Sequence, residues 1–270
     1  MSQGNELFRL VFIKLGGSLI TDKRTEKSFR AEVMKRLASE VAMALRHDES
    51  LRLLIGHGSG SFGHVTAAQY GTVRGVQIDE QWRGFAQVAT VAAELNALVA
   101  HELAAVGIPI WRLQPSASAV CEDGKLVSMA LEPVRAALAH GLVPLVYGDV
   151  ALDSVRGGTI ISTETIFQYL AAHLPVREIY LLGEVGGVLD VEGGVIPEIT
   201  PGTVKQYQDA LKGSAGTDVT GGMLSKVRDM LALISTYGDL TIRIFDGRGP
   251  TVLYQALIGA AQPGTLIHSG

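Results

Sequence analysis

Apolar residues gather in short runs along the chain, and most of these runs lead into glycine. The runs predict strands at residues 10–13, 51–55, 108–113, 142–147, 178–182 and 241–245. Because they lack polar alternation, they are typical of strands buried on both faces of a parallel sheet. Shorter extended segments are predicted at 157–161 and at 265–267, the second at a sheet edge, and hairpins at 121–127 and 190–197.

Between the strands, apolar residues recur with the period of an amphipathic helix. Val33, Leu37, Val41 and Leu45 predict a helix over about residues 30–46. Further helices are predicted over residues 79–106, 134–139, 162–174, 203–212, 223–237 and 250–258, and an irregular lid or hairpin over 65–78. This alternation predicts an α/β fold, a three-layer αβα sandwich with a mainly parallel central sheet.

The composition favours a soluble globular protein. Of the 270 residues, 47% are hydrophobic and 19% are charged, and no low-complexity linker divides them, so we expect a single domain over residues 1–270. The net charge of −4 argues against a nucleic-acid partner. Cys121 is the only cysteine, which excludes a disulfide framework and a cysteine metal site. Without a membrane-length apolar run or a signal-like N-terminus, we expect a cytoplasmic protein with no membrane partner.

The stretch Gly56-His57-Gly58-Ser59-Gly60-Ser61-Phe62-Gly63-His64 follows a predicted buried strand. Its glycines allow the backbone to turn sharply and to approach a ligand with its N–H groups, which bind anions such as phosphate. A glycine-rich run can also be a plain flexible connector. His64, a titratable side chain at the end of the run, favours a functional role.

Lys14-Leu15-Gly16-Gly17-Ser18 and two further glycine-bearing turns, at 148–149 and 183–187, also follow predicted strands. The carboxyl ends of parallel strands meet at one edge of a sheet, where α/β proteins bind ligands. Glycine turns and distant lysines, with almost no free nucleophile, suit phosphoryl transfer, which depends on positioning and charge neutralisation. The pattern therefore points to a kinase.

The Lys-Leu-Gly-Gly-Ser sequence at residues 14–18, the glycine turn, and Asp-Val-Thr-Gly-Gly-Met-x-x-Lys at residues 218–226 resemble the amino acid kinase superfamily. The Gly-x-Gly-Ser-Phe-Gly-His form at residues 58–64 is narrower and resembles the isopentenyl phosphate kinases. The resemblance extends from about residue 10 to 267. It implies an amino acid kinase fold and transfer of the γ-phosphate of ATP to isopentenyl phosphate, with Mg²⁺ accompanying the nucleotide, in isoprenoid biosynthesis.

By this resemblance, Lys14 would contact the transferred phosphate and Lys23 would stabilise the transition state. Ser59 and His64 would hold the phosphate of the acceptor. Further ATP-binding positions implied are Leu15, Gly16, Gly17, Ser18, Gly60, Glu184, Gly222 and Lys226, and further acceptor-binding positions are Gly63 and Thr163. No metal ligands are implied. The part before about residue 150 would bind the acceptor, the part from about 151 would bind ATP, and the protein would be a homodimer.

The chain departs from the family pattern at three places. Thr163-Glu164 stands where the family commonly has Gly-Asp, Glu184-Val185-Gly186-Gly187 stands for Asp-Val-Asp-Gly, and Ser59 stands for a glycine. Glutamate at position 164 keeps the negative charge on a longer side chain. The loss of the second acid at Gly186 bears on which base the nucleotide site selects.

Two alternatives stay open at this point. The first is a related kinase that acts on another small phosphate or phosphonate such as fosfomycin. The second is a protein that binds or stores a nucleotide or an oxyanion without turnover. A helical stripe of Trp82, Phe85, Ala86 and Ala89 follows the glycine turn. We interpret it, with Phe85 as the central residue, either as the wall of a site for the five-carbon chain or as ordinary core.

Overall fold

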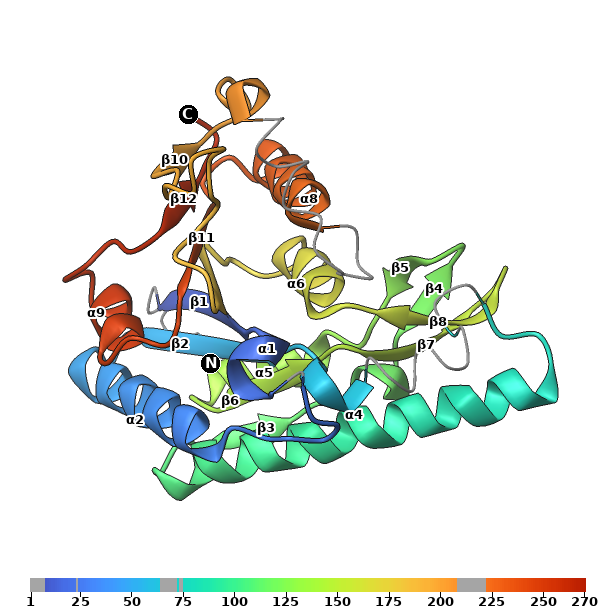
Figure 1. The fold of residues 1–270 in the computed structure, drawn as a ribbon. Helices are drawn as coiled ribbons and strands as arrows, with labels where there is room; N and C mark the ends of the chain where they lie inside the picture. Colours follow the sequence, from blue (N-terminus) through green and yellow to red (C-terminus); the bar gives the residue numbers. More distant parts are fainter. Residues whose placement is uncertain (1–7, 23, 64–71, 73–74, 208–221) are drawn as a thin grey trace, which may run out of the picture.

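The computed structural model describes residues 8–22, 24–63, 72, 75–207 and 222–270 (Figure 1). Its main feature is an eight-stranded sheet in the order β10-β12-β11-β9-β1-β2-β6-β3. The strands are β1 (Arg9–Leu15), β2 (Leu51–His57), β3 (Ile110–Arg112), β6 (Val143–Tyr147), β9 (Glu178–Gly183), β10 (Glu198–Ile199), β11 (Thr241–Asp246) and β12 (Thr265–Ile267). All neighbours are parallel except β11 and β12. The predicted mainly parallel sheet is confirmed.

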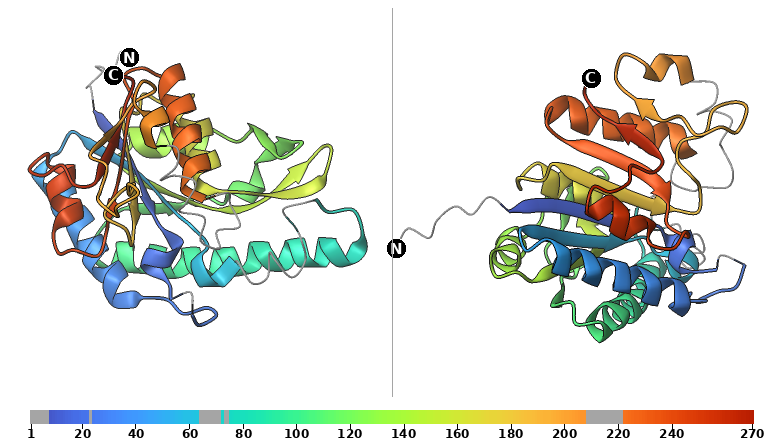
Figure 2. Two further views of the ribbon diagram at one scale, coloured as in Figure 1. Left: turned by 45° about the horizontal axis from the view of Figure 1, so that its top comes forward. Right: turned by 90° about the vertical axis from the view of Figure 1, so that its left-hand side faces the viewer.

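Helices cover both faces of this sheet. One face carries α5 (Glu132–Ala139), α6 (Thr163–Ala171) and α8 (Gly222–Thr236), and the other carries α1 (Gly17–Ile20), α2 (Ala31–His47), α4 (Asp79–Ala105) and α9 (Val252–Leu257). In the left view of Figure 2, α2 and α9 lie to the left of the strands and α8 lies to the right. The three-layer αβα prediction is therefore confirmed.

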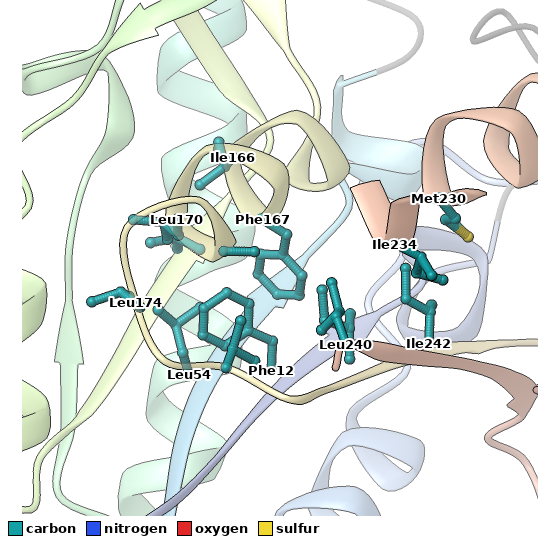
Figure 3. Close-up of a cluster of buried hydrophobic side chains, with 14 of the residues drawn as sticks. Phe12, Leu54, Ile166, Phe167, Leu170, Leu174, Met230, Ile234, Leu240 and Ile242 are labelled. Atoms are coloured by element: carbon teal, nitrogen blue, oxygen red, sulfur yellow. The ribbon is translucent and has the colours of Figure 1, made fainter. Parts of the chain in front are cut away.

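The core explains why the strands lack polar alternation. Phe12 and Leu54 point to one face and pack with α6, where the rings of Phe12 and Phe167 lie 5.1 Å apart (Figure 3). Their neighbours Val11 and Ile55 point to the other face and are equally buried. Successive side chains of a strand alternate in direction, so a strand between two helical layers needs apolar residues at every position.

A second, four-stranded sheet in the order β5-β4-β7-β8 lies over the amino-terminal half of α4 (Figure 1). It consists of β4 (Val120–Glu122), β5 (Lys125–Ser128), β7 (Asp149–Asp153) and β8 (Gly157–Ile161). Asp123 and Gly124 both have positive φ, 47° and 80°, as the predicted tight hairpin turn requires. The sequence pattern does not predict β7, because only one residue, Gly148, separates it from β6, and a glycine there indicates the end of a strand.

Three further predictions need correction. The 265–267 strand is not at the sheet edge, because β10 pairs outside it. The 190–197 hairpin is reduced to a single bridge between Leu189 and Val195. Of the helix predicted at 203–212, the structure describes a 3₁₀ turn, η3 (Val204–Tyr207), and residues 208–212 lie outside the described part. A second 3₁₀ turn is η2 (Pro115–Ala117).

Helix α4 is long and apolar enough, by length and composition, to cross a membrane. However, 44% of its most apolar window is buried inside the protein, and its residues Val88, Leu95, Val99 and Leu103 belong to the core. The hydrophobicity of α4 is thus explained by its packing under both sheets.

Candidate active site

The carboxyl ends of the parallel strands meet at one edge of the main sheet, as predicted. Leu15 at the end of β1 lies between His57 of β2 and Leu182 of β9. Tyr147 of β6 pairs with His57 on the far side. The glycine turns that follow these strands therefore share one edge.

The turns after β1 and β2 are in direct backbone contact. A Cβ atom added to Gly17 would lie 2.4 Å from the amide nitrogen of Gly60. Gly60 has a φ of +51°, and a Cβ atom there would lie 2.1 Å from Oγ1 of Thr21. The Thr21 hydroxyl donates to the Gly17 carbonyl (2.6 Å) and accepts from the amide of Ser61 (2.9 Å). Only glycine permits this approach, so the two turns form one unit.

The other predicted positions of these turns follow from the same contacts. Gly16 donates its N–H to the carbonyl of Leu182 at 2.8 Å, which ties the turn to β9. Leu15 is buried, and its carbonyl accepts the N–H of Gly58 at 3.1 Å, so its side chain is not accessible to a ligand. Ser18 and Ser59 are half-buried, and Gly63 lies against the side chain of Ser59. Backbone N–H groups and serine hydroxyls are the groups that bind phosphate in such turns.

Lys14, near the end of β1, forms an ion pair with Glu164 in the first turn of α6. Both side chains are largely buried, at 15% and 23% exposure. Helix α6 begins at this point because the Ser162 hydroxyl accepts the amide N–H of Thr165 at 3.0 Å. The sequence comparison indicates that Glu164 keeps the negative charge of the family position, but Glu164 is not among the predicted site residues. Its position three residues after Ile161, at the start of a helix that faces Lys14, was the available signal.

We expect Glu164→Gln to lower kcat by about 10- to 100-fold, because a charge-assisted hydrogen bond of about 1.5–3 kcal/mol that orients Lys14 is lost. Glu164→Asp keeps the charge but shortens the reach, so its loss should be smaller. Steady-state turnover of both variants against wild type is the measurement. Equal turnover of Glu164→Gln and wild type would show that the ion pair is dispensable.

Two residues predicted to contact a ligand, Thr163 and Glu184, form hydrogen bonds with other groups of the protein. Thr163 is buried, and its hydroxyl donates to the carbonyl of His57 at 2.6 Å, so this side chain links α6 to β2, and its predicted contact with the acceptor stays a prediction. Glu184 follows β9 at the shared edge, and its carboxylate accepts from Arg30 Nη1 at 2.5 Å. Both Arg30 and Glu184 are about one-third exposed, so this pair faces solvent.

The helical stripe of α4 is not core. The core face of α4 carries Gly84 and Val88 instead, and Trp82 is 38% exposed. Phe85 is half-buried, with its ring 5.3 Å from that of Trp82 and directly under Gly158 of β8. The interpretation of the stripe as ordinary core is therefore wrong for Trp82, and Phe85 lies between α4 and the small sheet.

Four predicted site residues lie wholly or partly outside the part of the chain that the structure describes. Lys23 and His64 lie outside the described residues. Gly222 and Lys226 belong to the first turns of α8, of which only the helical backbone is described. Within the described part of the chain, no group of three or more His, Cys, Asp or Glu side chains is arranged to hold a metal ion.

The comparisons with known proteins agree with this geometry. The model of the amino acid kinase family matches residues 9–246. The chain is 38% identical to isopentenyl phosphate kinase of Haloferax volcanii and 32% identical to that of Methanothermobacter thermautotrophicus. Each alignment covers 96% of this chain and 98% of the relative. A crystal structure of an isopentenyl phosphate kinase superposes with a TM-score of 0.81 at 30% identity, over 96% of this chain and 100% of the other. The chain belongs to the amino acid kinase family, and within it to the isopentenyl phosphate kinases.

Proposed function

We propose that this protein transfers the γ-phosphoryl group of ATP to isopentenyl phosphate, which yields isopentenyl diphosphate and ADP. The observation that carries the proposal is the pair of interlocked glycine turns beside Lys14 at one sheet edge. Three relatives of 30–38% identity that carry the name isopentenyl phosphate kinase support the choice of acceptor.

The chemistry needs no nucleophile from the protein. An ionised oxygen of the acceptor phosphate attacks the γ-phosphorus, and the bond to the β-γ bridging oxygen breaks. Backbone N–H groups of the glycine turns align the two phosphates, and the ammonium group of Lys14 neutralises charge on the transferred group. Glu164 orients that ammonium group. We assign the acceptor to the part before about residue 150 and ATP to the part after it.

Mg²⁺ belongs to the proposal as the partner of ATP. Its ligands are oxygen atoms, and it usually keeps several waters and binds mainly through substrate phosphates. When bound, the ion would neutralise charge on the nucleotide phosphates.

An apolar strip supports a site for the five-carbon chain. Gly158, which lies over Phe85, pairs with Leu152 across the β7–β8 ladder, and Leu152 pairs with Val120 of β4. Paired residues point to the same face of a sheet, so these side chains continue the surface on which Phe85 packs. Leu152 is 54% exposed and Val120 is 40% exposed. Apolar area next to Phe85 is thus accessible to a short hydrocarbon.

The experiment that tests the function is ADP release in a coupled assay with isopentenyl phosphate, fosfomycin and no acceptor. We expect rapid release with isopentenyl phosphate alone. Preference for fosfomycin would support the related-kinase alternative. ATP binding without release under any condition would support the binding or storage alternative.

We expect Phe85→Ala to raise activity on longer prenyl phosphates relative to isopentenyl phosphate. Each methylene newly accommodated in an apolar pocket contributes about 1–3 kcal/mol. The measurement is kcat/KM across a series of chain lengths. Leu98→Ala, an exposed apolar position on the same helix, is the matched control and should leave the profile unchanged. An unchanged profile in Phe85→Ala with lowered stability would mean that Phe85 only packs.

We propose further that the enzyme is a cytoplasmic homodimer. Closed symmetric dimers are the commonest oligomers of soluble proteins. An ATP-dependent reaction and a chain whose one cysteine is buried suit a reducing compartment. Sedimentation equilibrium would test the dimer, and a single species of 28.6 kDa would contradict it.

A further inference from the structure

A chain of hydrogen bonds runs from the exposed Arg112 through the buried Asn96 and His57 to the glycine turn, and it has no place in the reaction described above. Arg112 Nε of β3 lies 2.9 Å from Asn96 Oδ1, and Asn96 Nδ2 of α4 lies 3.1 Å from His57 Nε2. His57 Nδ1 in turn lies 3.1 Å from the carbonyl oxygen of Gly58. His57 and Asn96 are both completely buried.

The donor and the acceptor of every hydrogen bond in this chain follow from its two terminal groups, the guanidinium of Arg112 and the carbonyl of Gly58. Arg112 can only donate, so Asn96 presents Oδ1 to it and Nδ2 to His57. His57 Nε2 must then accept, which leaves the ring proton on Nδ1. The carbonyl oxygen of Gly58 can only accept, so Nδ1–H donates to it. Arg112 thus fixes the orientation of the Asn96 side-chain amide, and Asn96 in turn fixes the tautomer of the His57 ring.

The surroundings keep His57 neutral. Its ring stacks on Tyr147 of β6, with centroids 5.6 Å apart and planes at 8°. Burial lowers the pKa of His57 to about 4. Among the residues that the structure describes, the charged groups near this ring are Arg112, which reaches it through Asn96, and Asp149 of β7 behind Tyr147. Burial raises the pKa of both Tyr147 and Asp149, so Tyr147 adds no charge near neutral pH.

The bond to Gly58 orients the next peptide group. The peptide is trans, so its C=O and N–H point in opposite directions. With the Gly58 carbonyl turned inward to His57, the N–H of Ser59 points outward. Within the described part of the chain, this N–H has no acceptor. The hydrogen bond from His57 to Gly58 therefore leaves one backbone donor free in the turn assigned to phosphate.

We propose that Arg112, Asn96 and His57 are positioning residues that aim the N–H of Ser59 at the phosphate of the acceptor. The inference rests on the proposed function of the turn. None of the three contacts the reacting atoms. They act through the Gly58–Ser59 peptide, whose glycine would otherwise allow it to rotate.

Asn96→Asp tests the direction of the chain. A carboxylate at this position accepts from both sides, so His57 must donate from Nε2. At low pH the doubly protonated ring still donates from Nδ1 to Gly58. As the pH rises through the pKa of His57, which the new carboxylate raises, the ring loses its Nδ1 proton and the Gly58 carbonyl loses its donor. We expect kcat/KM for isopentenyl phosphate to fall about tenfold across this titration, as for one lost hydrogen bond.

Three controls isolate the effect. Gln87→Glu makes the same amide-to-acid change at an exposed position of α4 and should follow the wild-type pH profile. Asn96→Asp combined with His57→Phe should lose the new titration. His57→Phe alone keeps a ring on Tyr147 and should raise KM for the acceptor about tenfold, with KM for ATP unchanged. A wild-type pH profile in folded Asn96→Asp, or equal losses for both substrates in His57→Phe, would overturn the proposal.

A spectroscopic measurement separates this proposal from the choice of substrate. Nitrogen-15 shifts of wild-type His57 should show a proton on Nδ1 and none on Nε2 between pH 6 and 8, roughly one unit either side of neutrality. The amide of Ser59 should shift on addition of inorganic phosphate in wild type and less in His57→Phe. If isopentenyl phosphate is not turned over but these signals appear, the acceptor assignment fails and the positioning role stands. A proton on Nε2 would overturn the positioning role, whatever the substrate.

Discussion

Lys14→Met should lower kcat by about two to three orders of magnitude, the usual effect of removing an electrostatic stabiliser from a transition state. Lys14 lies at the carboxyl edge of β1, beside the interlocked turns and paired with Glu164. Methionine keeps the length and the apolar stem of the side chain but removes the positive charge. The free energy of unfolding should fall by about 1–3 kcal/mol, because the variant removes the ammonium partner of the largely buried Glu164 carboxylate, and the protein should stay folded.

Single-turnover kinetics with saturating ATP and isopentenyl phosphate measure this loss, and thermal unfolding measures the stability. Lys35→Met is the matched control, because Lys35 is an exposed lysine of α2 that pairs with Glu32. This control should turn over at the wild-type rate. Turnover of Lys14→Met within a fewfold of wild type would remove Lys14 from the mechanism.

Gly17→Ala should lower kcat/KM for both substrates by about a hundredfold. The added methyl group would lie 2.4 Å from the amide nitrogen of Gly60. The two turns must therefore separate by about 1 Å, a displacement that typically costs a catalytic site a hundredfold in rate. The overlap also strains the folded state, so we expect a loss of about 1–3 kcal/mol in the free energy of unfolding.

Gly238→Ala is the control for this prediction. Gly238 is exposed after α8, and a Cβ atom there would meet nothing within 4 Å. The control should keep wild-type kinetics and stability. If Gly17→Ala lost activity toward only one substrate, the turns would bind their phosphates independently and not as one unit.

Much of the site's location could be predicted from local sequence. The glycine turns at Gly16-Gly17 and at residues 58–63 follow apolar runs, and parallel strands bring their carboxyl ends together. These are consequences of short-range patterns. The pairing partners were not predictable in this way. Lys14 and Glu164 are 150 residues apart, and Arg30 and Glu184 are 154 apart, so no periodic pattern links them.

By itself, the sequence determined the layered α/β fold, the glycine turns and the lysine beside them, because apolar periodicity and glycine geometry act over a few residues. Only the tertiary structure decided that Lys14 pairs with Glu164 and that Gly158 covers the ring of Phe85. It also decided that the Thr163 hydroxyl donates to the carbonyl of His57. It also decided that His57, one of two histidines in one turn, is a buried neutral donor held by Asn96. Burial and hydrogen-bond direction depend on strands and helices that are distant in the chain, so they arise only when the layers pack.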